Sequence, residues 1–413
     1  MHKKKRAQVT VYIIIGIVIL FLAILLFYFR GTTEKEMGMQ ELVRAQKIPK
    51  EVRPITNYVT TQLDDATKKG LLFIGMQGGY IYESQGVPHV QDPTGEGSDF
   101  IYDNNYKVSY DIYKQDTDLF YFYFHEPWLY PWKKFPNVGG EYFPAGFEIF
   151  GINNLPPLNG PDPISIQSQL KEFITNYLRD KINLIIFDEQ GFEIDADVNK
   201  INVSVIIGEN DVIVFLEYPL GINKTITNTI TNVSYFYTNP QIRLKKVYNF
   251  VYDIISKDTV DILFNITNIN NIPSYIEGIN IKKNESAYCL NGCCDDLIII
   301  KDNKSMLYAK PYTFQFARGN RYPALHYLDI PMLQFEGYSN AVITEDDINP
   351  KADDPDEDVI DFTYEPDLPY HVEQSDFDRG YVDLIVYAKE KDNENENYKD
   401  GQKLRILVIG TPI

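Results

Sequence analysis

Residues 201–218 read Ile-Asn-Val-Ser-Val-Ile-Ile-Gly-Glu-Asn-Asp-Val-Ile-Val-Phe-Leu-Glu-Tyr, and this stretch decides the fold expected for the middle of the chain. It contains two alternating apolar runs, Ile201–Ile207 and Val212–Tyr218, of the kind that half-buried strands show. The residues between them, Gly208-Glu-Asn-Asp211, are typical of a tight turn. The stretch therefore predicts an antiparallel hairpin.

Helical patterns lie on both sides of the hairpin. Upstream, Asp162-Pro163 is an N-cap followed by a proline at the first helical position. One face of the helix that follows carries Leu170, Phe173, Ile174, Tyr177, Leu178 and Ile182. A further helix is expected from about Gln241 to Ser256. Helices set among antiparallel strands predict an α+β domain over residues 80–318.

Residues 30–79 are expected to form a linker and an amphipathic helix. From Pro54 to Ile74 the apolar residues recur at intervals of three and four, and Gly75, Gly78 and Gly79 follow as stops. The glycine run lacks the Gly-Lys-Ser/Thr end of a phosphate-binding loop, so we interpret it as a turn. Because the apolar face is only a stripe, we expect this helix to pack on the outer domain and not to enter a bilayer.

Aromatic residues gather between residues 119 and 132. Leu119–Phe124 has a strand pattern, and a proline-punctuated loop follows it. The candidate ligand platform here consists of Tyr121, Tyr123, Trp128, Tyr130 and Trp132. Such rings can stack on sugars or dock a protein, and the alternative is that they cover an adjacent core.

The N-terminal residues predict a membrane anchor. Val9 to Phe29 contains no charge, and at 1.5 Å per residue such a helix is about 31 Å long, which matches the hydrocarbon core of a bilayer. Residues 1–8 form a basic stub that the positive-inside rule holds in the cytoplasm. The sequence thus predicts one span through the lipid bilayer, with the bulk of the chain extracellular. A cleavable secretory signal is the alternative.

The segment Lys4-Lys5-Arg6-Ala7-Gln8-Val9-Thr10-Val11-Tyr12 resembles the class III signal of archaeal type IV pilin-like proteins. The resemblance implies cleavage between Ala7 and Gln8, with the apolar helix left attached. It also implies a subunit of a surface filament as an alternative function. The acidic residue usual at mature position five of those pilins is replaced here by Tyr12.

The last hundred residues differ in charge from the rest of the chain. Residues 345–400 contain 20 acids and 5 bases, so most of the net charge of −19 lies in this segment. Strand patterns persist inside it at Tyr381–Ala388 and Lys403–Ile409, which is unlike a disordered acidic tail. We therefore expect an all-β sandwich over residues 322–413.

This C-terminal part resembles the cadherin-like or immunoglobulin-like modules of microbial surface proteins. The resemblance rests on Asn349-Pro-Lys-Ala-Asp-Asp-Pro-Asp-Glu-Asp358, on Phe362-Thr-Tyr364 and on the strand from Gly380 to Ala388. In those modules an acidic turn binds calcium, so the resemblance makes Asp354, Asp356 and Asp358 candidate calcium ligands. Solvated acids are the alternative. Both ends of the chain together resemble anchored surface proteins of small archaea, which implies no activity.

The three cysteines, Cys289, Cys293 and Cys294, lie in a single segment. Outside the cell disulfides persist, so we expect one bridge from Cys289 to Cys293 or Cys294, and a thiolate metal site is the alternative. Asn-x-Ser/Thr triplets, which are glycosylation acceptors in secreted proteins, support the same location. They begin at Asn202, Asn223, Asn232, Asn265, Asn284 and Asn303.

The composition excludes one class of function and leaves others open. A net charge of −19 disfavours nucleic-acid binding, which needs clustered basic side chains. The sequence contains no nucleophile elbow and no His-Glu-x-x-His motif, so we expect no enzyme and no cofactor other than calcium. The leading hypothesis is a single-pass cell-surface protein with a structural, adhesive or ligand-binding role, whose partners are surface glycans or other surface proteins. An anchored hydrolase is the second alternative.

Overall fold

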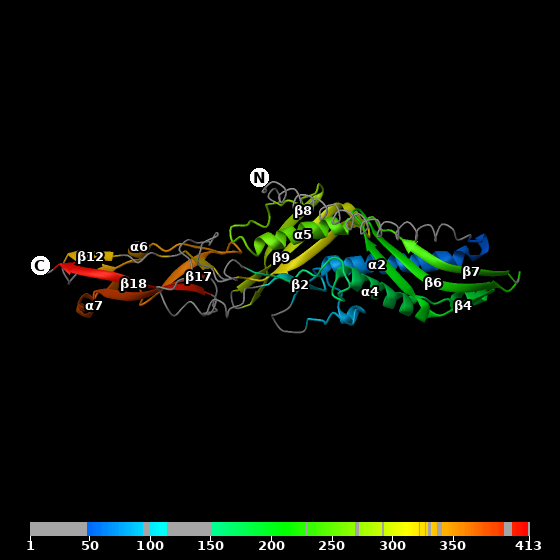
Figure 1. The fold of residues 1–413 in the computed structure, drawn as a ribbon, viewed down its shortest axis with the longest axis horizontal. Helices are drawn as coiled ribbons and strands as arrows, with labels where there is room; N and C mark the ends of the chain where they lie inside the picture. Colours follow the sequence, from blue (N-terminus) through cyan, green and yellow to red (C-terminus); the bar gives the residue numbers. More distant parts are fainter. Residues whose placement is uncertain are drawn as a thin grey trace, which may run out of the picture. The chain divides into compact units, whose positions relative to one another are not determined.

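The structure is a computed structural model that describes residues 48–93, 100–113 and 151–413. The last range has short gaps at 228, 269–271, 291–292, 322, 327, 329–331, 337–340, 392–398 and 412–413. The described residues form two compact units. The first contains 48–67, 171–206 and 213–240, and the second contains 68–170, 207–212 and 241–413. Figure 1 labels their helices and strands.

The first unit combines helices with a four-stranded sheet. Helix α2 (Arg53–Met76) begins in this unit, and α4 (Ile166–Lys181) ends in it. The strands are β4 (Phe192–Ala196), β5 (Asn202–Ile207), β6 (Val212–Lys224) and β7 (Thr229–Thr238). Strand β6 pairs with each of the other three. Short 3-10 helices are Lys50–Val52, Ile185–Gln190 and Val198–Lys200.

The predicted hairpin is confirmed. Strands β5 and β6 are neighbours in the sheet, and the N–H of Gly208 donates to the carbonyl of Asp211 at 2.9 Å across the turn. The predicted amphipathic helix is confirmed as α2, with Ile55, Val59 and Leu63 fully buried. The hydrophobic periodicity was sufficient to predict both elements, because one face of each is buried against the rest of the protein and the other is not.

The start of α4 differs from the prediction. The helix begins at Ile166, and the Ser165 hydroxyl accepts the N–H of Ser168 at 3.3 Å, which is the N-cap interaction. Asp162 instead closes a turn before the helix, where its carboxylate accepts the N–H of Ile164 at 3.0 Å. The predicted N-cap therefore lies three residues too early, because Asp162 and Ser165 both carry a cap-type side chain.

The second unit is built on a six-stranded sheet with the order β1-β2-β10-β9-β8, and β3 also pairs with β2. The strands are β1 (Phe100–Asp103), β2 (Tyr106–Tyr113), β3 (Ile152–Asn153), β8 (Ile279–Leu290), β9 (Cys293–Leu307) and β10 (Lys310–Arg318). Strands β2 and β10 run parallel, and the other pairs are antiparallel. Helix α5 (Leu244–Asp258) buries Val247, Phe250 and Ile254 and contacts β9.

The C-terminal part of the second unit contains further strands and two short helices. A four-stranded sheet has the order β12-β18-β17-β15, from Met332–Glu336, Lys399–Thr411, Tyr381–Glu390 and Ile360–Glu365. Two small pairs are β11 (Ala324–Leu325) with β14 (Ala352–Asp353), and β13 (Val342–Ile343) with β16 (Tyr370–His371). The helices are α6 (Glu345–Ile348) and α7 (Gln374–Arg379). Leu384, Val386 and Ile406 are among the residues of its core.

The predicted fold class, a transmembrane helix followed by an α+β domain and a β-sandwich, is wrong. The described chain is mostly β-sheet with a few helices, and none of these helices is both long and apolar enough to cross a membrane. The predicted span, Val9–Phe29, lies outside the described residues. In the C-terminal part, two-residue strand pairs take the place of the second full sheet that a sandwich requires.

Candidate functional site

A cavity of about 630 Å³ lies in the second unit, between the end of α2, strand β2 and the start of α4. We call it the tyrosine cavity. It is lined by Tyr80, Tyr82, His89, Val90, Gln91, Asp92, Pro93, Ser109, Tyr110, Tyr113, Asn154 and Ile164. Its size is within the range of small-molecule sites, and its wall alternates aromatic rings with polar groups.

Local structure at the end of α2 explains why two tyrosines face this space. Gly78 and Gly79 adopt φ values of +70° and +89°, which end the helix in a left-handed turn. Tyr80 and Tyr82 follow in extended backbone and lead into the 3-10 helix Glu83–Gln85. Their rings lie parallel, with an interplanar angle of 5° and centroids 6.3 Å apart.

Hydrogen bonds hold three of the four tyrosine rings in place. The Tyr80 hydroxyl donates to the carbonyl of Asn154 at 2.6 Å, and the Tyr82 hydroxyl donates to the carbonyl of Lys107 at 3.1 Å. The Tyr110 hydroxyl donates to the Asp295 carboxylate at 2.6 Å. Because each hydroxyl is already bonded, these residues present ring surface to the cavity in a fixed orientation.

A buried acid supports the floor of the cavity. Asp111 is fully buried and lies on the same face of β2 as Ser109, with 2.7 Å between Asp111 Oδ1 and the Ser109 hydroxyl. Burial raises the pKa of Asp111 well above its ordinary value. The Ser109 hydroxyl is the donor in the bond to Asp111, and it also lies within donating distance of the carbonyl of Gln77, at 3.1 Å. Ser109 thereby links the buried acid to a carbonyl just after the C-terminus of α2.

The tyrosines beside Asp111 remain phenols. Burial, followed by the charge of Asp111, raises the pKa of both Tyr80 and Tyr82. Neither a phenolate base nor a free hydroxyl donor is therefore provided by these two residues. The arrangement favours binding by ring stacking over proton transfer.

The predicted calcium turn is organised differently from a metal site. The side chain of Asp354 accepts the backbone N–H groups of Asp356 and Asp358, at 2.8 and 3.1 Å, and so closes its own turn. Asp356 lies against Arg318 and Arg321. Among the residues that the structure describes, no three His, Cys, Asp or Glu side chains form a group that could hold a metal. Calcium binding stays a prediction, and this geometry gives it no support.

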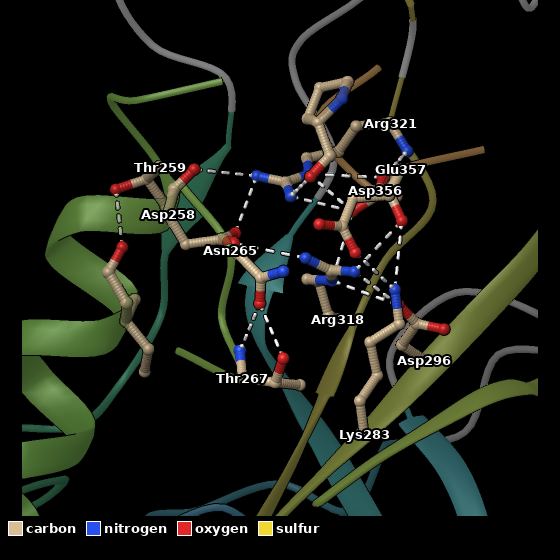
Figure 2. Close-up of polar contacts among 12 residues, drawn as sticks. Asp258, Thr259, Asn265, Thr267, Lys283, Asp296, Arg318, Arg321, Asp356 and Glu357 are labelled. Atoms are coloured by element: carbon tan, nitrogen blue, oxygen red, sulfur yellow. Dashed lines mark hydrogen bonds and ion pairs between the residues drawn. The ribbon is translucent and has the colours of Figure 1, made fainter. Parts of the chain in front are cut away.

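Asp356 belongs to a buried ion-pair network, which we call the arginine–aspartate cluster. It consists of Arg318 and Arg321 with Asp258, Asp296 and Asp356 (Figure 2). Figure 2 shows both guanidinium groups directed at these carboxylates, and Lys283 approaching from β8. Both arginines are at most 2% exposed.

The distances within the arginine–aspartate cluster are those of charge-assisted hydrogen bonds. Arg318 Nη2 lies 2.5 Å from Asp296 Oδ2, and Arg321 Nη2 lies 2.7 Å from Asp356 Oδ1. Arg321 Nη1 donates to the Asp258 carbonyl at 3.0 Å and pairs with Asp258 Oδ2 at 2.8 Å without hydrogen-bond geometry. Burial alone would raise the pKa of Asp356, but the charges of Arg321 and Arg318 outweigh it and hold that pKa below its ordinary value.

The arginine–aspartate cluster joins segments that are distant in sequence. Asp258 ends α5, Asp296 lies in β9, Arg318 ends β10, and Asp356 lies in the turn between β14 and β15. Its role is therefore structural, because it connects the six-stranded sheet to the C-terminal part of the same unit.

The other predicted site residues have separate positions. Cys294 is disulfide-bonded, and Cys289 stands directly opposite it in the β8–β9 register. Cys293 pairs with Leu290 in the same register. The candidate platform Tyr121, Tyr123, Trp128, Tyr130 and Trp132 lies outside the described residues, and so do Ala7 and Gln8.

Sequence reasoning missed both the tyrosine cavity and the arginine–aspartate cluster. One signal was available for the cluster, since Phe316-Ala-Arg-Gly-Asn-Arg321 places two arginines at the end of an apolar strand. For the cavity the alternation Tyr80-Ile-Tyr82 indicated rings on one side of an extended segment. Neither pattern predicts which distant segments pack against these residues.

Comparison with known proteins adds little. No family model matches the chain, and no curated protein matches it. Among solved structures, a crystal structure of human mucin-like protocadherin EC1-2 is similar, with a TM-score of 0.16 and 10% sequence identity. The match covers 33% of this chain and 86% of that chain. A TM-score of this size carries no argument about fold or function.

Proposed function

We propose that this chain is a cell-surface binding protein whose tyrosine cavity receives one sugar unit of a surface glycan. The observation that carries the proposal is the combination of fixed aromatic rings with polar side chains around one cavity of about 630 Å³. A pyranose offers an apolar C–H face, which stacks on aromatic rings, and a rim of hydroxyl groups, which hydrogen-bond to polar side chains. Gln91, Asp92 and Asn154 supply such groups at the wall.

The fixed orientation of the tyrosine rings supports the binding of a sugar, which offers only a small apolar surface. The rings of Tyr80, Tyr82 and Tyr110 are held by hydrogen bonds to Asn154, Lys107 and Asp295. A pre-formed aromatic wall loses little side-chain entropy when the ligand arrives. The proposed role is binding and not catalysis, because the hydroxyl groups of these three tyrosines already donate within the protein.

Two observations support a location outside the cell. The disulfide at Cys294 is of the kind that persists in oxidising compartments. Several glycosylation triplets begin at exposed asparagines, namely Asn202, Asn232, Asn265 and Asn303. A surface location places the tyrosine cavity where glycans are available.

A glycan array followed by calorimetric titration tests the proposal. Tyr113→Ala removes a half-buried ring from the wall, and Tyr102→Ala removes a 68% exposed ring of β1 that does not line the cavity. We expect the Tyr113 variant to lose saccharide binding and the Tyr102 variant to keep it, with both variants folded by circular dichroism at the temperature of the titration. If no saccharide binds the full chain, or if both variants bind as well as the wild type, the proposal is refuted.

A further inference from the structure

We propose that the tyrosine cavity selects an amino sugar, a sugar that carries a protonated amino group, over neutral and anionic sugars. This inference rests on the proposed function and names the ligand class of the same site. The arrangement that carries it is a carboxylate with an unused oxygen, Asp92, placed in a wall of tyrosine rings that contains no lysine or arginine.

Asp92 has binding capacity that the protein does not use. Its Oδ1 atom is buried and has no hydrogen-bond partner among the described residues. Its Oδ2 atom lies 3.9 Å from Lys107 Nζ, a distance at the limit of an ion pair. Because Asp92 lines the cavity and its side chain is 16% exposed, its carboxylate favours a ligand that brings its own donor, and a charged donor most of all.

Lys107 does not neutralise Asp92 by close contact, because it is engaged elsewhere. Its ammonium group donates to the carbonyl of Pro93 at 3.3 Å and lies 5.2 Å from the centroid of the Phe100 ring. It is also absent from the lining of the cavity. Lys107 therefore balances the charge of Asp92 only at the limit of an ion pair, 3.9 Å, and the cavity is lined by Asp92 but not by Lys107.

The aromatic wall is compatible with a cation. Four of the twelve lining residues are tyrosines, and the face of a tyrosine ring attracts an ammonium group through its quadrupole. Apart from the tyrosines, the titratable lining residues are Asp92 and His89. A carboxylate or phosphate on the ligand would meet no lysine or arginine there and would be repelled by Asp92. The net charge of −19 acts in the same direction at longer range.

The test uses four probes that separate the sugar ring from its charge. Glucosamine, glucose and glucuronate share a ring and differ in charge, and ethanolamine carries the ammonium group without the ring. Each is titrated into the full chain by calorimetry, at a pH where glucosamine is protonated. We expect glucosamine to bind about tenfold more tightly than glucose, a ratio that corresponds to about 1.4 kcal/mol. Glucuronate and ethanolamine should bind more weakly than glucose and glucosamine respectively.

A matched pair of variants assigns the preference to one carboxylate. Asp92→Asn keeps the shape and removes the charge, and we expect it to bring the glucosamine-to-glucose ratio close to one. Glu83→Gln removes one charge from an exposed residue that does not line the cavity, and it should leave the ratio unchanged. High salt should reduce the wild-type ratio, because partly exposed charge pairs are screened.

The outcomes distinguish this inference from the proposed function. Equal binding of glucose and glucosamine refutes the amino-sugar preference and leaves a sugar-binding cavity. Ethanolamine binding as tightly as glucosamine also refutes it, because the ring would then contribute nothing. A tenfold ratio that survives in Asp92→Asn shows that another group selects the cation. No binding of any monosaccharide refutes the proposed function itself.

Discussion

Replacing Arg321 by methionine removes one of the two cations at the centre of the arginine–aspartate cluster and keeps a similar side-chain length. Arg321 is fully buried, and its guanidinium group contacts the carboxylates of Asp258 and Asp356 as well as the carbonyl of Pro355. The cluster itself has two cations, Arg318 and Arg321, for three carboxylates, and Lys283 beside it lies 3.6 Å from Asp296. The variant therefore removes one of the two guanidinium groups that compensate these buried carboxylates.

The magnitude follows from what remains around Asp356. Removing one partner of a buried ion pair costs about 3–5 kcal/mol. Here Arg318 Nε stays 3.1 Å from Asp356 Oδ1, and the backbone N–H of residue 321 still donates to Oδ2 at 2.7 Å. We therefore expect a loss near the lower end, about 3 kcal/mol in the free energy of unfolding of the second unit.

Urea unfolding followed by far-UV circular dichroism measures this loss. Arg405→Met is the matched control, because Arg405 pairs with Asp383 at 2.8 Å where both side chains are about one-third exposed. Such a pair contributes little, so the control should unfold almost as the wild type does. The double variant Arg321→Met/Asp356→Asn restores charge balance and should lose at least about 1 kcal/mol less than the sum of its single variants.

Two results would contradict this reasoning. One is an Arg321→Met variant that is no less stable than Arg405→Met, which would mean that the buried charge is solvated or unimportant. The other is a double variant whose loss equals the sum of the two single losses, which would mean that Arg321 and Asp356 do not interact energetically.

Four further predictions concern other parts of the chain. Burial and the charge of Asp356 raise the pKa of Asp354 to about 8, so the folded protein retains a proton that the unfolded chain releases above pH ~4. The free energy of unfolding should therefore fall by a few kcal/mol as the pH rises from about 4 to about 8. Urea unfolding across this pH range measures the fall, and an Asp354→Asn variant should lack it. Because the Asp354 and Asp356 carboxylates already bind groups of the protein, we expect millimolar calcium to leave the melting temperature unchanged relative to chelator, and a rise of several degrees would confirm the calcium site predicted from the sequence. Gly78→Ala and Gly380→Ala both place a side chain at positive φ. At Gly78 the added methyl group would lie 2.2 Å from the Ser109 hydroxyl, whereas at Gly380 it meets nothing within 4 Å. Gly78→Ala should therefore show the larger drop in melting temperature. Peptide mapping of unreduced protein should find Cys294 blocked to alkylation, and a freely alkylated Cys294 would contradict the disulfide.

The sequence alone determined the local elements whose signals lie within a single short segment. The turn residues between Gly208 and Asp211 and the alternation on either side were sufficient for the β5–β6 hairpin. The apolar stripe of α2 was sufficient for that helix. In both elements the contacts that decide the structure join residues close in the chain, so a periodic pattern contains the information.

Only the tertiary structure decided the site and the way the strands assemble. Asp258 and Asp356 are about a hundred residues apart, yet both contact Arg321, and Tyr80, which follows α2, lines the same cavity as Tyr110 of β2. The acidic turn at Asp354 had the composition of a calcium loop, but two arginines from another segment occupy the carboxylate of Asp356. The composition shows which charged residues the chain contains. The partner of each charged residue depends on the fold, because the fold packs segments that are distant in sequence against each other.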